Sequence, residues 1–316
     1  MLTALLVAAA LDPLALGHRA QTEFMTGKVD PLCEQFTPEL RAAFPNGKAD
    51  FQAFQASVFL QAGAPIGEGR ERAWRVAGGR YVFIQAFLNA PAGLQFSWTF
   101  DPAGRASGLL VGQPKPPVAN PYETYQLKTS LRLPFTGRWT VFWGGRTVEE
   151  NYHAAYRDQR YALDLEIMQD GATHAGDGKR NEQYYCFHQP IVAPAAAQVV
   201  EALDGLPDNP PGVMDPKNAA GNHVLLDFGN GEYALLAHLS KGSVRVKAGQ
   251  AVQAGDRLGL CGNSGNTSEP HLHFHVQDGP KLFAGDGRPA QFLGYKRDGV
   301  AVERGEPSAG QVIEPN

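Results

Sequence analysis

The segment EPHLHFHVQDG at positions 269–279 constrains this chain most, because it sets three of the nine histidines at every second position. Successive side chains of a β-strand point to opposite faces. His271, His273 and His275 therefore share one face of a predicted strand, and Leu272 and Phe274 lie on the other. The apolar face predicts burial in a core. The opposite face is polar and bulky, and three adjacent imidazoles there indicate a functional site.

Composition narrows the class of protein. A chain of 316 residues favours two domains, and 43% hydrophobic residues with 10% aromatics are typical of globular domains with sizeable cores. The formal charge of −4 gives no basic surface for nucleic acid, so we expect no nucleic-acid partner. With 36 glycines and 23 prolines, the sequence favours turn-rich β structure over a helical bundle.

The first residues predict export. Residues 2–11 are apolar but too few to span a bilayer, and Ala15 and Gly17 suit the −3 and −1 positions of a cleavage site. We therefore expect a signal peptide over residues 1–17 and a periplasmic or extracellular protein, although the first basic side chain is only Arg19. A buried first helix is the alternative. No later stretch predicts a transmembrane segment.

Residues 18–111 predict a small α+β domain. Helices are expected over residues 23–44, broken near Pro31, and from Asp50 to Gly63, followed by strands over 80–88, 94–100 and 105–111. This domain holds no catalytic constellation. The segment 112–124, which begins GQPKPPVANP, predicts a proline-rich linker.

Residues 125–305 predict a mostly antiparallel β domain, with a hairpin around Gly229–Gly231 and a tail over 306–316. The long turn-rich loops at 169–183 and 204–221 are expected to form walls of a site. Three cysteines are too few for a disulfide scaffold. Cys186 and Cys261 could pair in an exported protein, with buried free thiols as the alternative.

Potential metal ligands gather in this second domain. Besides the histidine triple, it contains His153, Asp164 and His238. Imidazole and carboxylate are usual zinc ligands, and a catalytic zinc takes three protein ligands and keeps one position open. The residues alone leave open whether the first two or the last two histidines of the triple form the working pair.

Three segments carry a resemblance to a known family. In chain order they are NYHAAYRDQRYALDL, GNHVLLDFGNGEYALLAHLS and GLCGNSGNTSEPHLHFHV. They resemble the lysostaphin-type (LytM-like) zinc metallopeptidases, which cut peptide bonds in bacterial cell-wall peptidoglycan. The resemblance covers about residues 130–300.

The resemblance implies a site and a function. One zinc ion would be bound by His153, Asp164 and His273, with His238 and His271 as the catalytic histidines. The implied function is that of a secreted zinc endopeptidase acting on peptidoglycan. The alternatives are a non-catalytic regulator of other wall hydrolases on the same scaffold, and a secreted protease of glycine-rich proteins. The sequence leaves the oligomeric state open.

The sequence departs from the family pattern at two places. The family commonly sets its first histidine and aspartate close together, whereas here 11 positions separate His153 from Asp164. The residue after His-Leu-His-Phe is often Glu in the family and is His275 here. We expect His275 to be a non-ligand at the edge of the site, and the alternatives are contact to a ligand, contact to substrate, or an exposed residue at the end of the strand.

The N-terminal domain loosely resembles cystatin-like or nuclear-transport-factor-like α+β domains, which suggests a binding or positioning module. His174, His188 and His223 are interpreted as ordinary structural residues, and Gly262-Asn263-Ser264-Gly265 as a tight turn that precedes the site strand.

Overall fold

The computed structural model describes residues 11–316, and they divide into two compact units. The first unit extends to Pro114 and includes Asp170–Ala172, and the second begins at Lys115. Residues 1–10 of the predicted signal peptide lie outside the described residues. Within 11–316, no helix is both long enough and apolar enough to cross a membrane.

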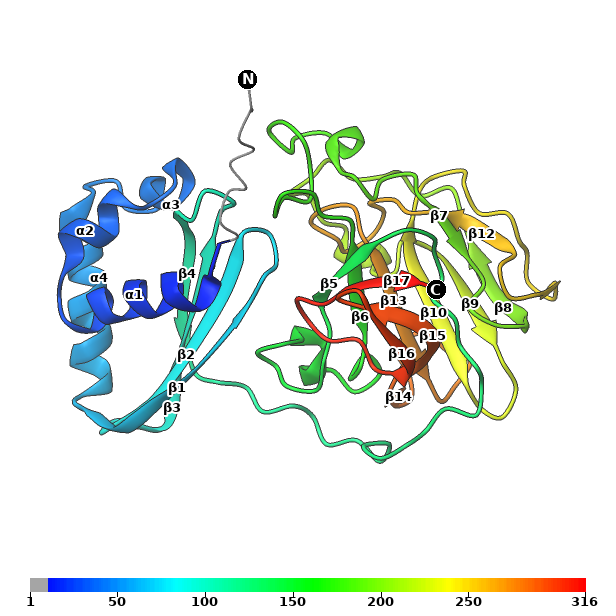
Figure 1. Cartoon of the computed structure of the whole chain (residues 1–316), viewed down its shortest axis with the longest axis horizontal. Helices are drawn as coiled ribbons and strands as arrows, with labels where there is room; N and C mark the ends of the chain where they lie inside the picture. Colours follow the sequence, from blue (N-terminus) through cyan, green and yellow to red (C-terminus); the bar gives the residue numbers. More distant parts are fainter. Residues whose placement is uncertain (1–10) are drawn as a thin grey trace, which may run out of the picture. The chain divides into compact units, whose positions relative to one another are not determined.

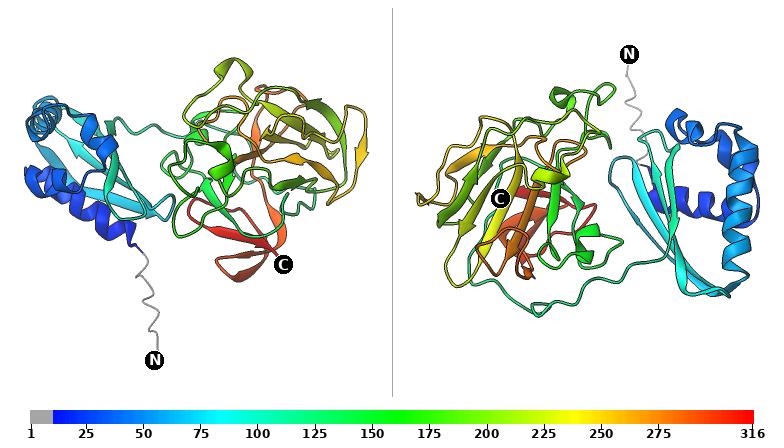
Figure 2. Two further views of the ribbon diagram at one scale, coloured as in Figure 1. Left: turned by 90° about the horizontal axis from the view of Figure 1, so that it is seen from above. Right: turned by 180° about the vertical axis from the view of Figure 1, so that it is seen from behind.

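The first unit is an α+β domain in which helices lie along one face of an antiparallel sheet (Figures 1 and 2). Phe24 and Phe51 from the helices pack with Phe96 and Trp98 from the sheet. The sheet order is β1-β2-β3-β4. The elements are α1 (Pro13–Met25), α2 (Val29–Glu34), α3 (Pro38–Ala42), α4 (Lys48–Ala62), β1 (Pro65–Trp74), β2 (Gly79–Phe87), β3 (Ala90–Phe100) and β4 (Ala106–Gly112).

The helices of this unit begin and end at residues other than those expected. The predicted break near Pro31 is wrong, because the chain turns at Gly27 (φ 74°) and Pro31 lies in the first turn of α2. Proline is tolerated there, since the first helical N–H groups have no intrahelical partner. The cap of α4 is Gly47 and not Asp50, which lies in the first turn, while Gly63 ends the helix as expected.

The last residues of the predicted signal peptide belong to α1. The Asp12 side chain accepts hydrogen bonds from the N–H groups of Leu14 and Ala15 and so caps this helix. A Cβ at Gly17 would lie 1.9 Å from the Tyr81 ring, so only glycine permits this approach. The position of the cleavage site stays a prediction.

The second unit is built on one long antiparallel sheet, which confirms the expected β architecture. Its strand order is β11-β8-β9-β10-β13-β6-β5-β17-β15-β16, with β14 paired to β13, and β12 pairs separately with β7. The elements are β5 (Trp139–Trp143), η1 (Tyr152–Ala155), β6 (Leu163–Glu166), η2 (Asn181–Gln183), β7 (Pro190–Val192), β8 (Ala197–Leu203), η3 (Pro216–Asn218), β9 (Asn222–Asp227), β10 (Tyr233–Leu239), β11 (Ala251–Val252), β12 (Arg257–Leu260), β13 (Leu272–Gln277), β14 (Gly287–Arg288), β15 (Phe292–Arg297), β16 (Val300–Gly305) and β17 (Val312–Pro315).

The expected tail over residues 306–316 is wrong, because Val312–Pro315 form a strand inside the sheet. This strand, β17, pairs with β5 on one side and β15 on the other. Ile313 is fully buried in the same core as Trp139 and Phe292. The apolar side chains and the two ladders hold this segment in the domain.

The histidine strand β13 lies between β10 and β6 (Figure 1). Leu272, Phe274 and Val276 are buried in the hydrophobic core, as the alternation predicts. The remaining side chains of the strand therefore face the opposite side, where β10 and β6 contribute their own polar residues.

Two cysteines lie in this unit as buried free thiols. Cys186 and Cys261 are both fully buried. The Cys186 thiol donates a hydrogen bond to the Pro270 carbonyl at 2.9 Å. The sequence left open a disulfide or two free thiols, and the structure contains the free thiols.

Candidate metal centre

Strand register brings the candidate ligands together. His273 on β13 stands directly opposite Asp164 on β6, and its Nδ1 lies 2.9 Å from Asp164 Oδ1. His153 Nε2 lies 3.6 Å from Asp164 Oδ2. One ligand atom from each of the three residues falls within 4.8 Å of the others, and all three side chains are buried. The structure therefore groups the three residues expected from the sequence.

The long separation between His153 and Asp164 is bridged by the short helix η1. The Asn151 side chain caps this helix by accepting from the His153 N–H, and the Tyr156 N–H donates to the His153 carbonyl at 2.8 Å. The chain turns again where the Ala162 N–H donates to the Gln159 carbonyl. The inserted residues thus form a turn that returns the chain to β6 beside His153.

The Asn151 side chain also fixes the tautomer of His153. Its amide nitrogen donates to the carbonyls of Gly145 and Ala162, so its oxygen is the atom that faces His153 Nδ1 at 2.8 Å. His153 Nδ1 must then carry the hydrogen, which leaves Nε2 with a free lone pair. This Nε2 has no hydrogen-bond partner among the described residues, and the side chain is 1% exposed.

The electrostatics of this group suit a divalent cation. Burial lowers the pKa of His153 to about 3, so its imidazole is neutral. Burial alone would raise the pKa of Asp164, but the surrounding histidines outweigh it and hold that pKa well below its usual value, with hydrogen bonds from His271 and His273 among the causes. A buried carboxylate beside a bare imidazole nitrogen is a donor set that fits Zn²⁺.

His238 occupies a strained position at the end of β10. Its φ of 62° lies in the left-handed region, where the pairing of β10 with β9 changes register between Leu236 and Leu239. This bulge turns the side chain toward the cleft. The Nδ1 atom donates to the Ser264 carbonyl at 2.8 Å, and burial lowers the pKa of the imidazole well below its usual value.

His271 is anchored in the same way. Its Nδ1 lies 2.9 Å from the Glu269 carbonyl and 3.1 Å from the Thr267 hydroxyl, which itself donates to that carbonyl. Nδ1 is therefore the donor, and Nε2 lies 3.5 Å from Asp164 Oδ1. Burial lowers the pKa of His271, but the Asp164 carboxylate outweighs it and the net pKa is raised.

The two predicted catalytic histidines are neighbours. Their ring centroids are 4.7 Å apart, and the ring of His238 lies 5.8 Å from that of His273. In both His238 and His271 a backbone carbonyl binds Nδ1, so Nε2 is the atom left for chemistry.

Residues that anchor these histidines were missed by sequence reasoning. Asn151 stands two positions before His153, and this spacing is the one available signal. The tight turn assigned to Gly262–Gly265 places the Ser264 carbonyl, while the Ser264 hydroxyl donates to the Leu239 carbonyl and accepts from the Asn222 N–H. Backbone carbonyls leave no mark in a sequence.

His275 is not an exposed residue at the end of its strand, so that alternative is wrong. It is 1% exposed, because the chain continues beyond it and pairs β13 with β14 at Val276. Its Nδ1 lies 2.9 Å from His273 Nε2. The alternative of a contact to a ligand is the one that the structure contains.

The other histidines of this unit stay outside the group. His174 packs against the Tyr184 ring, His188 Nε2 lies 3.0 Å from the Ser240 hydroxyl, and His223 Nδ1 lies 2.8 Å from the Gly221 carbonyl. Their interpretation as structural residues stays a prediction, because His174 Nδ1 and His223 Nε2 are buried without a hydrogen-bond partner among the described residues.

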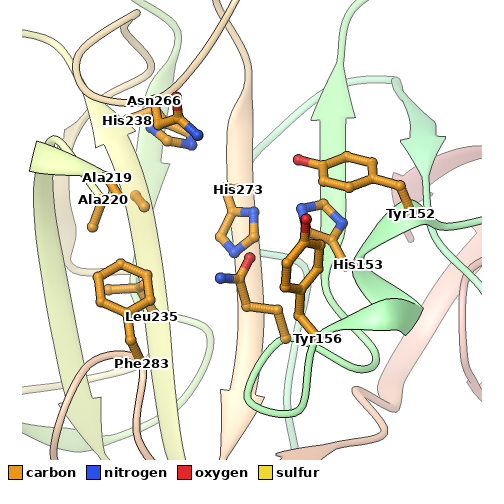
Figure 3. Close-up of a pocket in the computed structure, with 12 residues that line it drawn as sticks. Tyr152, His153, Tyr156, Ala219, Ala220, Leu235, His238, Asn266, His273 and Phe283 are labelled. Atoms are coloured by element: carbon orange, nitrogen blue, oxygen red, sulfur yellow. The ribbon is translucent and has the colours of Figure 1, made fainter. Parts of the chain in front are cut away.

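A cleft of about 190 Å³ is lined by His153, His238 and His273. Figure 3 shows His273 between His153 and His238, with Tyr152 and Tyr156 on the side of His153. The opposite side carries small and apolar residues. They are Ala219, Ala220, Leu235, Ala237 and Phe283.

Comparison with known proteins identifies the family of this domain. Residues 184–285 match the sequence model of Peptidase family M23, which confirms the resemblance seen in the sequence. The match includes His238, His271 and His273, while His153 and Asp164 precede it. The second unit therefore carries an M23 peptidase domain.

Curated relatives match over short segments. A 57-residue segment is 46% identical to the peptidoglycan DD-endopeptidase ShyA of Vibrio cholerae, over 18% of this chain and 13% of that protein. A 62-residue segment is 40% identical to the cell division protein DipM of Caulobacter vibrioides, over 20% of this chain and 10% of that protein. The alignments thus span less than a fifth of the length of these relatives.

Similar solved structures include the catalytic domain of lysostaphin from Staphylococcus simulans, at 19% identity and a TM-score of 0.30 over 48% of this chain and 87% of that one. A putative M23 peptidase from Pseudomonas aeruginosa is also 19% identical, with a TM-score of 0.30 over 71% of this chain and 89% of that one. The loose resemblance of the first unit to cystatin-like or nuclear-transport-factor-like domains stays a prediction.

Proposed function

We propose that this chain, whose residues 184–285 form an M23 domain, is an exported zinc-dependent endopeptidase that hydrolyses peptide bonds of bacterial peptidoglycan. The observation that carries the proposal is the convergence of five side chains. His153, Asp164 and His273 form a buried donor set, and His238 and His271 stand beside it with Nδ1 bound to backbone carbonyls.

The proposed zinc ligands are His153 Nε2, an Asp164 carboxylate oxygen and His273 Nδ1. These atoms face one another, and His153 Nε2 is buried without another partner among residues 11–316. When bound in such a site, Zn²⁺ polarises the scissile carbonyl and lowers the pKa of water.

The remaining chemistry belongs to His238 and His271. A neutral imidazole with hydrogen on Nδ1 offers its Nε2 lone pair as a base. One of the two Nε2 atoms accepts the proton of the attacking water and returns it to the leaving amine. The other histidine must carry a second hydrogen, on Nε2, and as an imidazolium it can donate a hydrogen bond to the oxygen of the tetrahedral intermediate. Both rings are fixed before substrate arrives, because backbone carbonyls hold their Nδ1 atoms.

The cleft supports a peptide substrate with small side chains. Ala219, Ala220 and Ala237 line one side, where the main chain of an extended peptide can approach closely. Tyr152 and Tyr156 line the other side and can bound its path. The Vibrio cholerae relative is named a peptidoglycan DD-endopeptidase, which supports the same substrate class here. Because peptidoglycan lies outside the cytoplasmic membrane, we also propose export by the leader over residues 1–17.

Metal content and wall hydrolysis together test this proposal. The purified protein should bind one Zn²⁺ per chain by elemental mass spectrometry and release soluble fragments from purified peptidoglycan sacculi. A matched His238→Ala variant should bind zinc and release none. Zinc binding without release would favour a regulator of other hydrolases or a protease of glycine-rich proteins, and absence of zinc binding would contradict the metal site.

A further inference from the structure

A chain of buried hydrogen bonds extends from the predicted ligand His273 away from the cleft. It begins at Gln277, the last residue of β13, which is fully buried. The Gln277 amide nitrogen donates to the carbonyls of Gly279 at 2.6 Å and Lys281 at 2.9 Å. Two carbonyl acceptors fix the orientation of this amide, because a carbonyl oxygen there would face two other oxygens.

The fixed amide assigns the hydrogen of His275. The Gln277 Oε1 atom faces His275 Nε2 at 2.9 Å, and since this oxygen can only accept, Nε2 must carry the hydrogen. In a neutral imidazole the other nitrogen is then an acceptor. His275 Nδ1 lies 2.9 Å from His273 Nε2 and so accepts a hydrogen bond from it.

His273 therefore donates from Nε2, and its Nδ1 is the atom that faces Asp164. That Nδ1 lies 2.9 Å from Asp164 Oδ1, at hydrogen-bond distance. Two acceptor atoms at this distance are favourable only with a positive charge between or beside them, which is a proton on Nδ1 or a metal ion in its place. If His273 Nε2 accepted instead, both nitrogens of buried His275 would have to donate, and that charged ring would have no carboxylate among its hydrogen-bond partners.

We infer that His275 and Gln277 are positioning residues that keep a hydrogen on His273 Nε2, and so direct Nδ1 of this ring toward the metal. The inference rests on the proposed function, because that function supplies the metal. It also gives a role to the position where the related family often has Glu. Here a neutral imidazole, itself oriented by an amide, supplies the acceptor for His273 Nε2–H.

Zinc affinity in a pair of variants tests the inference. The Leu and Asn side chains introduced by His275→Leu and His275→Asn have similar size and shape, but only Asn offers an oxygen close to the place of His275 Nδ1. Loss of an outer partner of a metal-bound histidine typically weakens metal binding about 10- to 100-fold. In competition with a chromophoric chelator, we expect His275→Leu to show such a loss and His275→Asn to retain most of the native affinity. The zinc affinity of Gln277→Met should lie between those of the two His275 variants.

A second measurement reads the tautomer directly and needs neither zinc nor substrate. In the zinc-free protein with ¹⁵N-labelled histidine, two-bond ¹H–¹⁵N spectra should show His273 and His275 both protonated at Nε2. The signals of His273 should shift toward the other tautomer in Gln277→Met.

Two results would overturn the inference. One is a His273 without hydrogen on Nε2 in the native zinc-free protein, and the other is a folded His275→Leu variant that binds zinc as tightly as the native chain. If His275→Leu does not fold, the native spectra and Gln277→Met decide. A native protein with the expected tautomers that binds no zinc would contradict the proposed function while leaving the tautomer assignment in place.

Discussion

At the scale of single residues, the candidate site is defined by which nitrogen each histidine leaves free. His153 is oriented by an asparagine side chain, and His238 and His271 are oriented by backbone carbonyls. In all three, Nδ1 is the anchored atom. His273 is the exception, because its Nδ1 faces Asp164 and its Nε2 faces away from the cleft.

Removal of a ligand should abolish metal binding and turnover together. His273→Ala deletes one of three proposed ligands and leaves the Asp164 carboxylate buried without its closest partner. We expect no stoichiometric zinc by elemental analysis and no hydrolysis of peptidoglycan. His188→Ala is the matched control, since this histidine lies outside the group, and it should keep both properties. One tightly bound zinc in His273→Ala would refute the ligand assignment.

Removal of either proposed catalytic histidine should greatly slow hydrolysis and leave zinc binding intact. His238→Ala and His271→Ala keep the three ligands, so zinc should remain bound. Loss of a general acid–base group typically lowers kcat about 10²- to 10⁴-fold. Steady-state kinetics on a cross-linked peptide from peptidoglycan, with zinc content measured on the same samples, check this expectation. A variant with near-native kcat would show that its histidine is not part of the chemistry.

At the scale of elements, the alternation along β13 couples the core to the site. Phe274 is fully buried and packs against Phe292, with ring centroids 5.3 Å apart, while its neighbour His273 faces the cleft. Strand registers on both sides then align His273 with Asp164 and with Ala237. Packing of the apolar face therefore sets the position of the ligand.

Truncation of this core side chain should weaken both folding and metal binding. Phe274→Ala leaves a cavity, and such changes typically cost about 3–5 kcal/mol of unfolding free energy. Urea denaturation of the zinc-free protein should show this loss, and chelator competition should show weaker zinc binding. Phe274→Leu should lose less in both. Unchanged zinc affinity in a destabilised Phe274→Ala would show that the core does not position the ligand.

Glu232, in the turn of the β9–β10 hairpin, connects this hairpin to the segment that precedes β5. This fully buried carboxylate accepts hydrogen bonds from the N–H groups of Lys128 and Thr129 and from the Tyr125 hydroxyl. Burial alone would raise its pKa, but these donors, with the Thr129 hydroxyl, outweigh it and lower the pKa below the ordinary value of 4.5. The ionised form therefore ties the segment before β5 to the hairpin.

Acid should remove this stabilisation. Since the folded-state pKa lies below the unfolded value, the contribution is fully present above about pH 4.5 and is lost as pH falls through the folded-state pKa. Glu232→Gln should lower the unfolding free energy at pH 7 by about 1.5–3 kcal/mol, the range for a hydrogen bond to a charged group. The difference in unfolding free energy between Glu232→Gln and the native protein should shrink as the pH falls, and thermal unfolding at several pH values measures it. A constant difference from pH 7 to pH 3 would contradict the assignment.

Local pattern predicted some elements and missed others for physical reasons. The hairpin around Gly229–Gly231 and the strand at 271–276 could be predicted, because turn residues and alternation are local signals. The strand within residues 306–316 could not be predicted from local pattern. Its pairing with β5 and β15 depends on segments that are far away in sequence. The sequence gives the contact of His275 with His273 only as one of several alternatives. The burial of His275 depends on the pairing of β13 with β14, which local pattern does not reveal.

At the scale of the whole molecule, the proposed chemistry lies entirely in the second unit. All five site residues and their hydrogen-bond partners belong to it. The first unit has its own core of helices and sheet. We propose that it is an accessory module over residues 18–111 that binds or positions the wall substrate.

Deletion of residues 18–111 should therefore leave zinc affinity unchanged, because no ligand or orienting residue is removed. Hydrolysis of a small soluble peptide should also be retained, while hydrolysis of intact sacculi should fall. Chelator competition and the two activity assays check these outcomes. Equal activity of the deleted and full chains on sacculi, with unchanged localisation, would contradict the accessory role.

The central claim is most directly tested by mass spectrometry of peptidoglycan fragments after digestion with the zinc-loaded protein, with His273→Ala as the control. We predict new products, cut within stem peptides or cross-bridges, that appear only with the native protein and whose masses identify the bond. Identical fragment profiles for the two proteins, with zinc bound to the native one, would contradict a peptidoglycan endopeptidase.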